Sequence, residues 1–154
     1  MSQDGLYLVG AMYTSRAFSC PANARCMLPR YPEGQNSLIH KFDVEPSGTL
    51  EYVASNVVSG TPLNQYSMSE DAAGNFRLLT TSRGNQVTTH LFVLDKELDL
   101  EGLLLNIEPG EEFKAARYIG DKLYLVTFEQ IDPLFVIDIA DTSNPEIIGE
   151  LKIP

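Results

Sequence analysis

The stretch Leu91–Asp95, which reads Leu-Phe-Val-Leu-Asp, decides the fold because it occurs more than once in the chain. It returns 43 residues later as Leu134–Asp138 (Leu-Phe-Val-Ile-Asp), and a weaker copy, Leu38–Asp43, ends 52 residues before Asp95. Four apolar residues in a row leave a strand without a polar face, so both of its faces must be covered. These stretches therefore predict strands buried between layers rather than one sheet with a solvated side.

Each copy is preceded by one extended segment and followed by another. The preceding segments are 5–9, 75–79 and 122–126, and the following ones are 50–53, 103–105 and 147–151. A period of roughly 40–50 residues with four strands per unit is typical of propeller blades, which pack face to face about an axis. We therefore predict an all-β fold, a partial β-propeller of about two and three-quarter blades of four-stranded antiparallel sheets.

Eleven short segments rich in β-branched and aromatic residues are expected to be strands, and no apolar stripe of helical spacing is found. They are Gly5–Met12, Ser37–Val44, Thr49–Ser55, Leu63–Glu70, Asn75–Thr81, Thr88–Asp95, Glu101–Asn106, Lys114–Ile119, Lys122–Phe128, Leu134–Ile139 and Glu146–Ile153. They group into one propeller segment over 1–154: an incomplete blade (1–61) with a long loop (13–36), a second blade (62–110) and a third (111–154). A closed propeller needs at least four blades, so we expect an open arc.

Composition limits the classes of partner. The 154 residues weigh 17.1 kDa, are 44% hydrophobic and carry a formal net charge of −10. An acidic chain is a poor ligand for nucleic acid or an anionic membrane, because phosphate binding needs clustered Lys and Arg. No apolar run approaches the roughly 20 residues of a membrane span.

Two cysteines, Cys20 and Cys26, are separated by five residues. A zinc site would need further ligands nearby, and the spacing does not fit a thioredoxin-type motif. A local disulfide that pins a loop is the preferred interpretation, and two free thiols are the alternative. A disulfide would imply an oxidising compartment.

The loop at 13–36 is the feature that departs from the repeat, because about 24 residues join strands that most blades connect in a few. It is basic and partly aromatic, and the connection at 129–133 that we expect at the same end of the strands is acidic. One hypothesis is a face that binds a protein or a glycan, and the other is a loop that folds back onto its own acidic body or packs against a neighbouring blade. The candidate binding residues are Arg16, Arg25, Arg30, Tyr31, Glu129 and Asp132.

Other candidate residues favour structural roles. The aspartates that end the repeats (Asp43, Asp95, Asp138) are expected to accept hydrogen bonds from turn N–H groups. The acidic cluster of Glu129, Asp132, Asp138 and Asp141 lacks the spacing of a calcium loop. His40 and His90 each lie alone in a strand. No catalytic residue, metal site or cofactor is therefore expected.

Several longer stretches resemble a known family: the secreted prokaryotic proteins with a C-terminal β-propeller domain distantly related to WD-type repeats. They are Leu63–Glu70 with Phe76–Thr81, Tyr118–Phe128, and Ile131–Asp138 continuing through Asn144–Pro145 to Gly149–Pro154. The resemblance implies a propeller fold, export from the cell, with an extracellular or cell-surface location, and a longer parent protein. It implies no reaction.

The function expected from the sequence is that of a non-catalytic binding or scaffold module of an exported protein. The alternative is part of an enzyme whose active site is shared with blades absent from this chain. Because the two end sheets of an arc would each expose an apolar face, we expect a homo-oligomer or contacts with further blades.

Overall fold

The structure is a computed structural model that describes residues 5–128 and 132–153, except for 15–33. Within the described residues, eleven strands and one short 3₁₀ helix follow one another. They are β1 (Gly5–Thr14), β2 (Gly34–Val44), β3 (Leu50–Ser59), η1 (Gln65–Ser67), β4 (Met68–Glu70), β5 (Phe76–Arg83), β6 (Val87–Leu94), β7 (Leu100–Ile107), β8 (Glu112–Ile119), β9 (Lys122–Phe128), β10 (Asp132–Asp138) and β11 (Glu146–Ile153).

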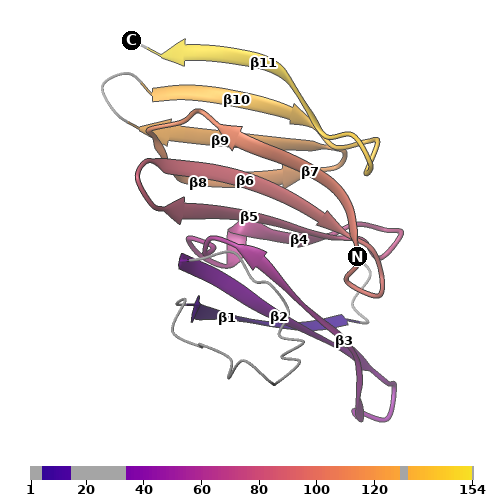
Figure 1. Ribbon diagram of the computed structural model, residues 1–154. Helices are drawn as coiled ribbons and strands as arrows, with labels where there is room; N and C mark the ends of the chain where they lie inside the picture. Colours follow the sequence, from indigo (N-terminus) through magenta and orange to yellow (C-terminus); the bar gives the residue numbers. More distant parts are fainter. Residues whose placement is uncertain (1–4, 15–33, 129–131, 154) are drawn as a thin grey trace, which may run out of the picture.

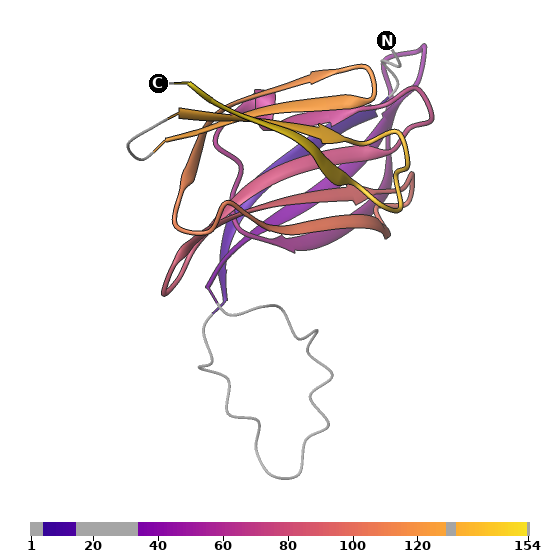
Figure 2. The same ribbon diagram turned by 90° about the horizontal axis from the view of Figure 1, so that it is seen from above.

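The strands form three antiparallel sheets, and within each sheet every strand pairs with its neighbour in the sequence. Their orders are β1-β2-β3, β4-β5-β6-β7 and β8-β9-β10-β11. Figure 1 shows the sheets in succession, from the indigo and purple strands β1–β3 to the orange and yellow strands β9–β11, and Figure 2 views the same stack from above. The predicted all-β class is confirmed, and we call the three sheets blade 1, blade 2 and blade 3.

The register aligns the three blades with one another. Lys41 pairs with Tyr7, Val93 with Arg77 and Val136 with Tyr124. The recurring stretch is therefore the central strand β2, β6 or β10 of each blade, and β1 corresponds to β5 and β9. Blade 1 has no strand beyond β1 among the described residues, whereas blades 2 and 3 have β4 and β8 there.

Two apolar layers lie between the three sheets. Between blades 1 and 2 the core includes Ile39, Val58, Leu78 and Leu94. Between blades 2 and 3 it includes Leu79, Leu91, Phe113, Leu123 and Ile137. All four apolar residues of the stretch at 91–94 are at most 7% exposed, because alternate side chains enter the two layers. The prediction that this strand is covered on both faces is confirmed.

One predicted strand, Leu63–Glu70, is largely wrong. Only Met68–Glu70 is a strand, and Gln65–Ser67 form the 3₁₀ helix before it. Asn64 starts this helix: its side chain accepts a hydrogen bond from Tyr66 N at 2.9 Å, and Ser67 Oγ accepts one from Asn64 N at 3.3 Å. Such reciprocal caps favour a helical turn over an extended chain.

The turn role expected of the repeat aspartates is confirmed for two of the three. Asp95 Oδ1 accepts hydrogen bonds from Glu97 N and Asp99 N, at 3.0 and 2.8 Å. Asp138 Oδ1 accepts one from Ala140 N at 3.0 Å. Asp43 pairs with Glu51 and Gly5 inside blade 1, and within the described residues its side chain accepts no hydrogen bond from a turn N–H group.

No helix in the described part of the chain is long and apolar enough to cross a membrane.

Candidate functional site

Most residues of the predicted binding face lie outside the described residues, so the structure does not place them. They are Arg16, Arg25, Arg30, Tyr31 and Glu129, and the predicted disulfide pair, Cys20 and Cys26, lies outside as well. Asp132 is the first residue of β10, where its backbone pairs with Ile153.

The expectation that several connections share one end of the strands agrees with two backbone contacts there. Gly110 N, between blades 2 and 3, donates to Val87 O at 2.9 Å, which places that connection beside the β5–β6 turn. Gly60 N, after blade 1, donates to Gln35 O at the start of β2, also at 2.9 Å. β1 ends at Thr14 and β2 begins at Gly34 at this same end of the strands.

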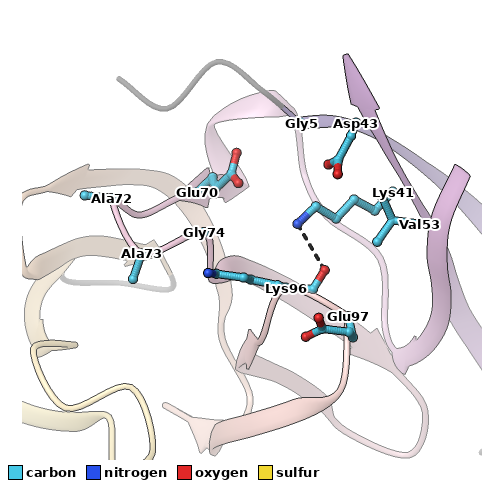
Figure 3. Close-up of a pocket in the computed structure, with 10 residues that line it drawn as sticks. All are labelled: Gly5, Lys41, Asp43, Val53, Glu70, Ala72, Ala73, Gly74, Lys96 and Glu97. Carbon is cyan, nitrogen blue, oxygen red and sulfur yellow. Dashed lines mark hydrogen bonds between the residues drawn. The ribbon is translucent and has the colours of Figure 1, made fainter. Parts of the chain in front are cut away.

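A polar cavity of about 360 Å³ lies at the opposite end of the strands, between blades 1 and 2 (Figure 3). Strand β2 contributes two lining residues, β4 and the turn after it contribute four, and the β6–β7 turn contributes two. Its charged lining residues are Lys41, Asp43, Glu70, Lys96 and Glu97, and the others are Gly5, Val53, Ala72, Ala73 and Gly74.

Lys41 is the most deeply placed charged group of this cavity. The residue is 5% exposed, and its side chain extends from β2 into the cavity toward the β6–β7 turn (Figure 3). Its Nζ donates to the backbone oxygen of Lys96 at 3.0 Å and lies 5.7 Å from the centre of the Tyr7 ring. Among the described residues, no carboxylate oxygen lies within 4.0 Å of Lys41 Nζ.

Tyr7 lies beside Lys41 but is not among the residues that line the cavity. Its ring stacks on Phe76 of blade 2 with 4.1 Å between the ring centres. Burial, and then the negative charge of Glu70, raise the pKa of the Tyr7 hydroxyl well above its usual value, so this group stays neutral. The negative charge near the cavity therefore comes from carboxylates and not from a phenolate.

Asp71 fixes the turn that closes one side of the cavity. Its carboxylate accepts hydrogen bonds from Ala73 N, Asn75 N and the Asn75 side chain, at 2.9 to 3.0 Å. Burial alone would raise the pKa of Asp71, but the hydrogen bonds from Asn75 and Ala73 and the nearby Arg77 bring it below its usual value. The turn that carries Ala72, Ala73 and Gly74 is thus held in place from within.

A second buried cation, Arg77, lies between blades 2 and 3 but is enclosed by protein groups. Arg77 donates to Gly120 O at 3.3 Å and to Ser69 Oγ at 3.0 Å, and its guanidinium lies 5.3 Å from the centre of the Tyr118 ring. The Tyr118 hydroxyl in turn donates to Ser67 O at 3.2 Å. These contacts join the two blades, so we assign Arg77 a structural role.

Neither histidine has the surroundings of a general base. His40 lies on the outward face of blade 1, with its ring centre 6.3 Å from that of Tyr52. His90 Nδ1 accepts a hydrogen bond from Asn106 N at 3.2 Å, and its Nε2 lies 3.1 Å from Thr88 Oγ1. Accepting at Nδ1 requires a neutral ring, so His90 is a structural acceptor for the backbone of β7. In the described part of the chain, no group of three or more His, Cys, Asp or Glu residues is arranged to hold a metal ion.

The stability of the protein is expected to decrease as the pH falls from 7.5 to 5.5, and His90→Gln should reduce this loss. Burial lowers the pKa of His90 below its usual value. In this range the unfolded chain, with a histidine pKa of about 6.5, takes up a proton that the folded protein does not bind. Melting temperatures of the two proteins at both pH values measure the difference. Equal losses in the wild type and the variant would show that His90 does not contribute.

The cavity around Lys41 was not predicted from the sequence, although one signal pointed to it. In the aligned repeats, the position of Lys41 is held by Val93 and Val136 in the other two blades. A lysine at a position that is otherwise apolar, and that is buried in blade 1, is unusual.

Comparisons with known proteins agree with this architecture. A family model described as a beta propeller domain matches residues 1–154. An uncharacterized protein of Methanocaldococcus jannaschii is 42% identical over 106 residues, which are 66% of this chain and 17% of that protein. An uncharacterized protein of Archaeoglobus fulgidus is 38% identical over 122 residues, 79% of this chain and 19% of that protein. The chain thus spans less than one fifth of the length of these relatives.

Proposed function

The chain belongs to the beta propeller domain family, and from that premise we propose that it is a non-catalytic scaffold module whose two end blades pack against further blades. The observation that carries this proposal is the exposure of apolar residues on the end blades at positions that are buried wherever a neighbouring blade is present.

On blade 1 these residues lie on the face that points away from blade 2. Leu6 and Leu8 are 38% and 52% exposed, whereas the equivalent residues of blade 2, Phe76 and Leu78, are 2% and 0% exposed. The same face of blade 1 carries Phe42 and Tyr52, whose rings meet edge to face at 5.6 Å. This surface has the composition of a blade–blade contact, and among the described residues no further blade covers it.

Blade 3 has the complementary face. Val126, Leu134 and Val136 point away from blade 2 and are partly exposed. The equivalent residues of blade 2 are Leu79, Leu91 and Val93, and each is 0% exposed because blade 3 covers it. The two end faces are therefore the two different halves of one repeated contact.

Two different halves favour head-to-tail association, in which blade 1 of one copy covers blade 3 of another. Two arcs of three blades would close into a ring of about six, within the usual range for propellers. We propose a second copy of this chain as the partner that covers these faces.

We also propose an extracellular or cell-surface location, with a protein or a glycan as ligand. The resemblance of the sequence to secreted propeller proteins supports the location, and the pair Cys20 and Cys26 would suit an oxidising compartment. The buried polar and charged side chains named above make structural contacts, which supports a role without catalysis. Arg77 and His90 each serve contacts that hold strands or blades together.

Light scattering over a range of protein concentrations tests the scaffold proposal. We expect the wild type to form a dimer or larger assembly, and Leu8→Lys to lower the mass to that of one chain, because a charge on this face cannot be buried without a partner. Leu105→Lys is the control, since Leu105 is 50% exposed and lies on β7, away from both end faces. A wild type of single-chain mass at every concentration, or equal masses for the wild type and Leu8→Lys, would overturn the proposal.

A further inference from the structure

We propose that the cavity between blades 1 and 2 binds a small zwitterion of the α-amino acid class, with the ligand carboxylate on Lys41 and the ligand ammonium on Asp43, Glu70 and Glu97. This inference does not depend on the assembly proposed above, because every residue of the cavity lies within one chain and none lies in the end-face contact.

Among the described residues, the ammonium group of Lys41 has N–H donors that no protein acceptor uses. An ammonium group has three N–H donors, and among the described residues only the backbone oxygen of Lys96 accepts from it. The Lys41 residue is 5% exposed and its ammonium faces the cavity, so two of its N–H donors are left for water or an anion there. Arg77 differs from Lys41 because two protein oxygens accept from it and an aromatic ring lies beside it, although its Nε has no hydrogen-bond partner among the described residues.

Three carboxylates of the cavity lie around Lys41 without pairing with its ammonium group. Figure 3 shows Asp43, Glu70 and Glu97 on different sides of the Lys41 side chain, and they come from β2, β4 and the β6–β7 turn. None of the three reaches ion-pair distance of Lys41 Nζ. The cavity therefore keeps its positive and negative groups apart, which suits a ligand that carries both charges.

The size and lining of the cavity favour a small charged ligand. A volume of about 360 Å³ admits a small molecule with a few waters, and no aromatic residue lines it. A sugar ring usually stacks on an aromatic face, so the lining favours a compact charged ligand over a glycan. The lining carries two lysines and three carboxylates, which a zwitterion leaves unchanged in net charge.

The proposal is tested by titrating the folded protein with L-alanine while amide chemical shifts and heats of binding are recorded. We expect saturable binding with a dissociation constant of about 0.1–1 mM, as befits a ligand of few atoms. The shifted amides should include those of Gly5, Gly74 and Glu97, which line the cavity. Acetate and methylammonium, which carry one charge each, should bind at least about tenfold more weakly.

Two variants separate this site from surface binding. Lys41→Met should weaken L-alanine binding at least about tenfold while the protein stays folded, since Val occupies the equivalent positions of the other blades. Lys114→Met, at a side chain that is 51% exposed on β8, should bind as the wild type does.

Four results would overturn the proposal. They are no shift at up to about 10 mM L-alanine, shifts confined to residues outside the cavity, acetate or methylammonium binding as tightly as L-alanine, and unchanged binding in Lys41→Met. The map of shifted amides in the wild type decides the question even if a variant does not fold.

Discussion

Gly102→Ala is expected to destabilise the protein by about 3 kcal/mol, because an added methyl group would collide with a neighbouring blade. A Cβ atom at Gly102 would overlap the backbone oxygen of Thr142 and lie 3.1 Å from Pro145 Cδ. Thr142 and Pro145 belong to the β10–β11 connection of blade 3, which crosses β7 of blade 2 at this point. Thr142 Oγ1 also donates to Glu101 Oε1 at 2.6 Å, so the connection is fixed where the methyl group would have to fit.

The repeat supplies a matched control in Gly149→Ala. Gly149 pairs with Val136 on β11 as Gly102 pairs with Val93 on β7, so both glycines occupy the same position of their blades. A Cβ atom at Gly149 would meet only Val136 side-chain atoms, at 3.8 and 3.9 Å. We expect this variant to stay within about 0.5 kcal/mol of the wild type in urea unfolding at a protein concentration where both have single-chain mass. Equal stability of the two alanine variants would contradict the packing of blade 3 over β7.

Phe113→Ala is expected to cost about 4 kcal/mol, because it empties the layer that joins blades 2 and 3. Phe113 is 1% exposed and lies in one cluster with Leu79 and Leu91 of blade 2 and Leu125 of blade 3. The removed ring leaves a cavity whose walls come from two sheets, so neither sheet can close it alone.

Urea unfolding of Phe113→Ala and Leu105→Ala measures this effect. Leu105 is 50% exposed, and its truncation should change the free energy of unfolding by at most about 0.5 kcal/mol. A loss below about 1 kcal/mol for Phe113→Ala would mean that the layer between blades 2 and 3 is not a packed core.

The blade architecture was predictable from the sequence because it depends on periodicity. Residues 91–94 are apolar without a break, and this pattern alone requires layers on both sides of the strand. The spacing of the repeats then gave the grouping of strands into sets of three, four and four, which the sheets confirm. The aspartates at 95 and 138 were correctly expected to close turns, since that role needs only local N–H groups.

Features that depend on contacts between blades were not predictable in the same way. The 3₁₀ helix at Gln65–Ser67 replaces part of a predicted strand because Asn64 and Ser67 cap it reciprocally. The close approach of the Thr142 backbone to Gly102 depends on a turn 40 residues further along the chain. The cavity around Lys41 required the register of four strands and two turns. The replacement of valine by lysine in one copy of the repeat nevertheless marked its position.

The central claim is that the end faces are two halves of one blade–blade contact. The most direct test is to measure contacts between methyl groups of different copies. A sample mixed from two differently labelled populations of the protein reports only contacts between copies. We predict nuclear Overhauser effects between Leu6 or Leu8 of one copy and Val126, Leu134 or Val136 of another. Contacts of Leu8 with Leu8 of the second copy, or no contact between these two faces in the associated protein, would contradict the account.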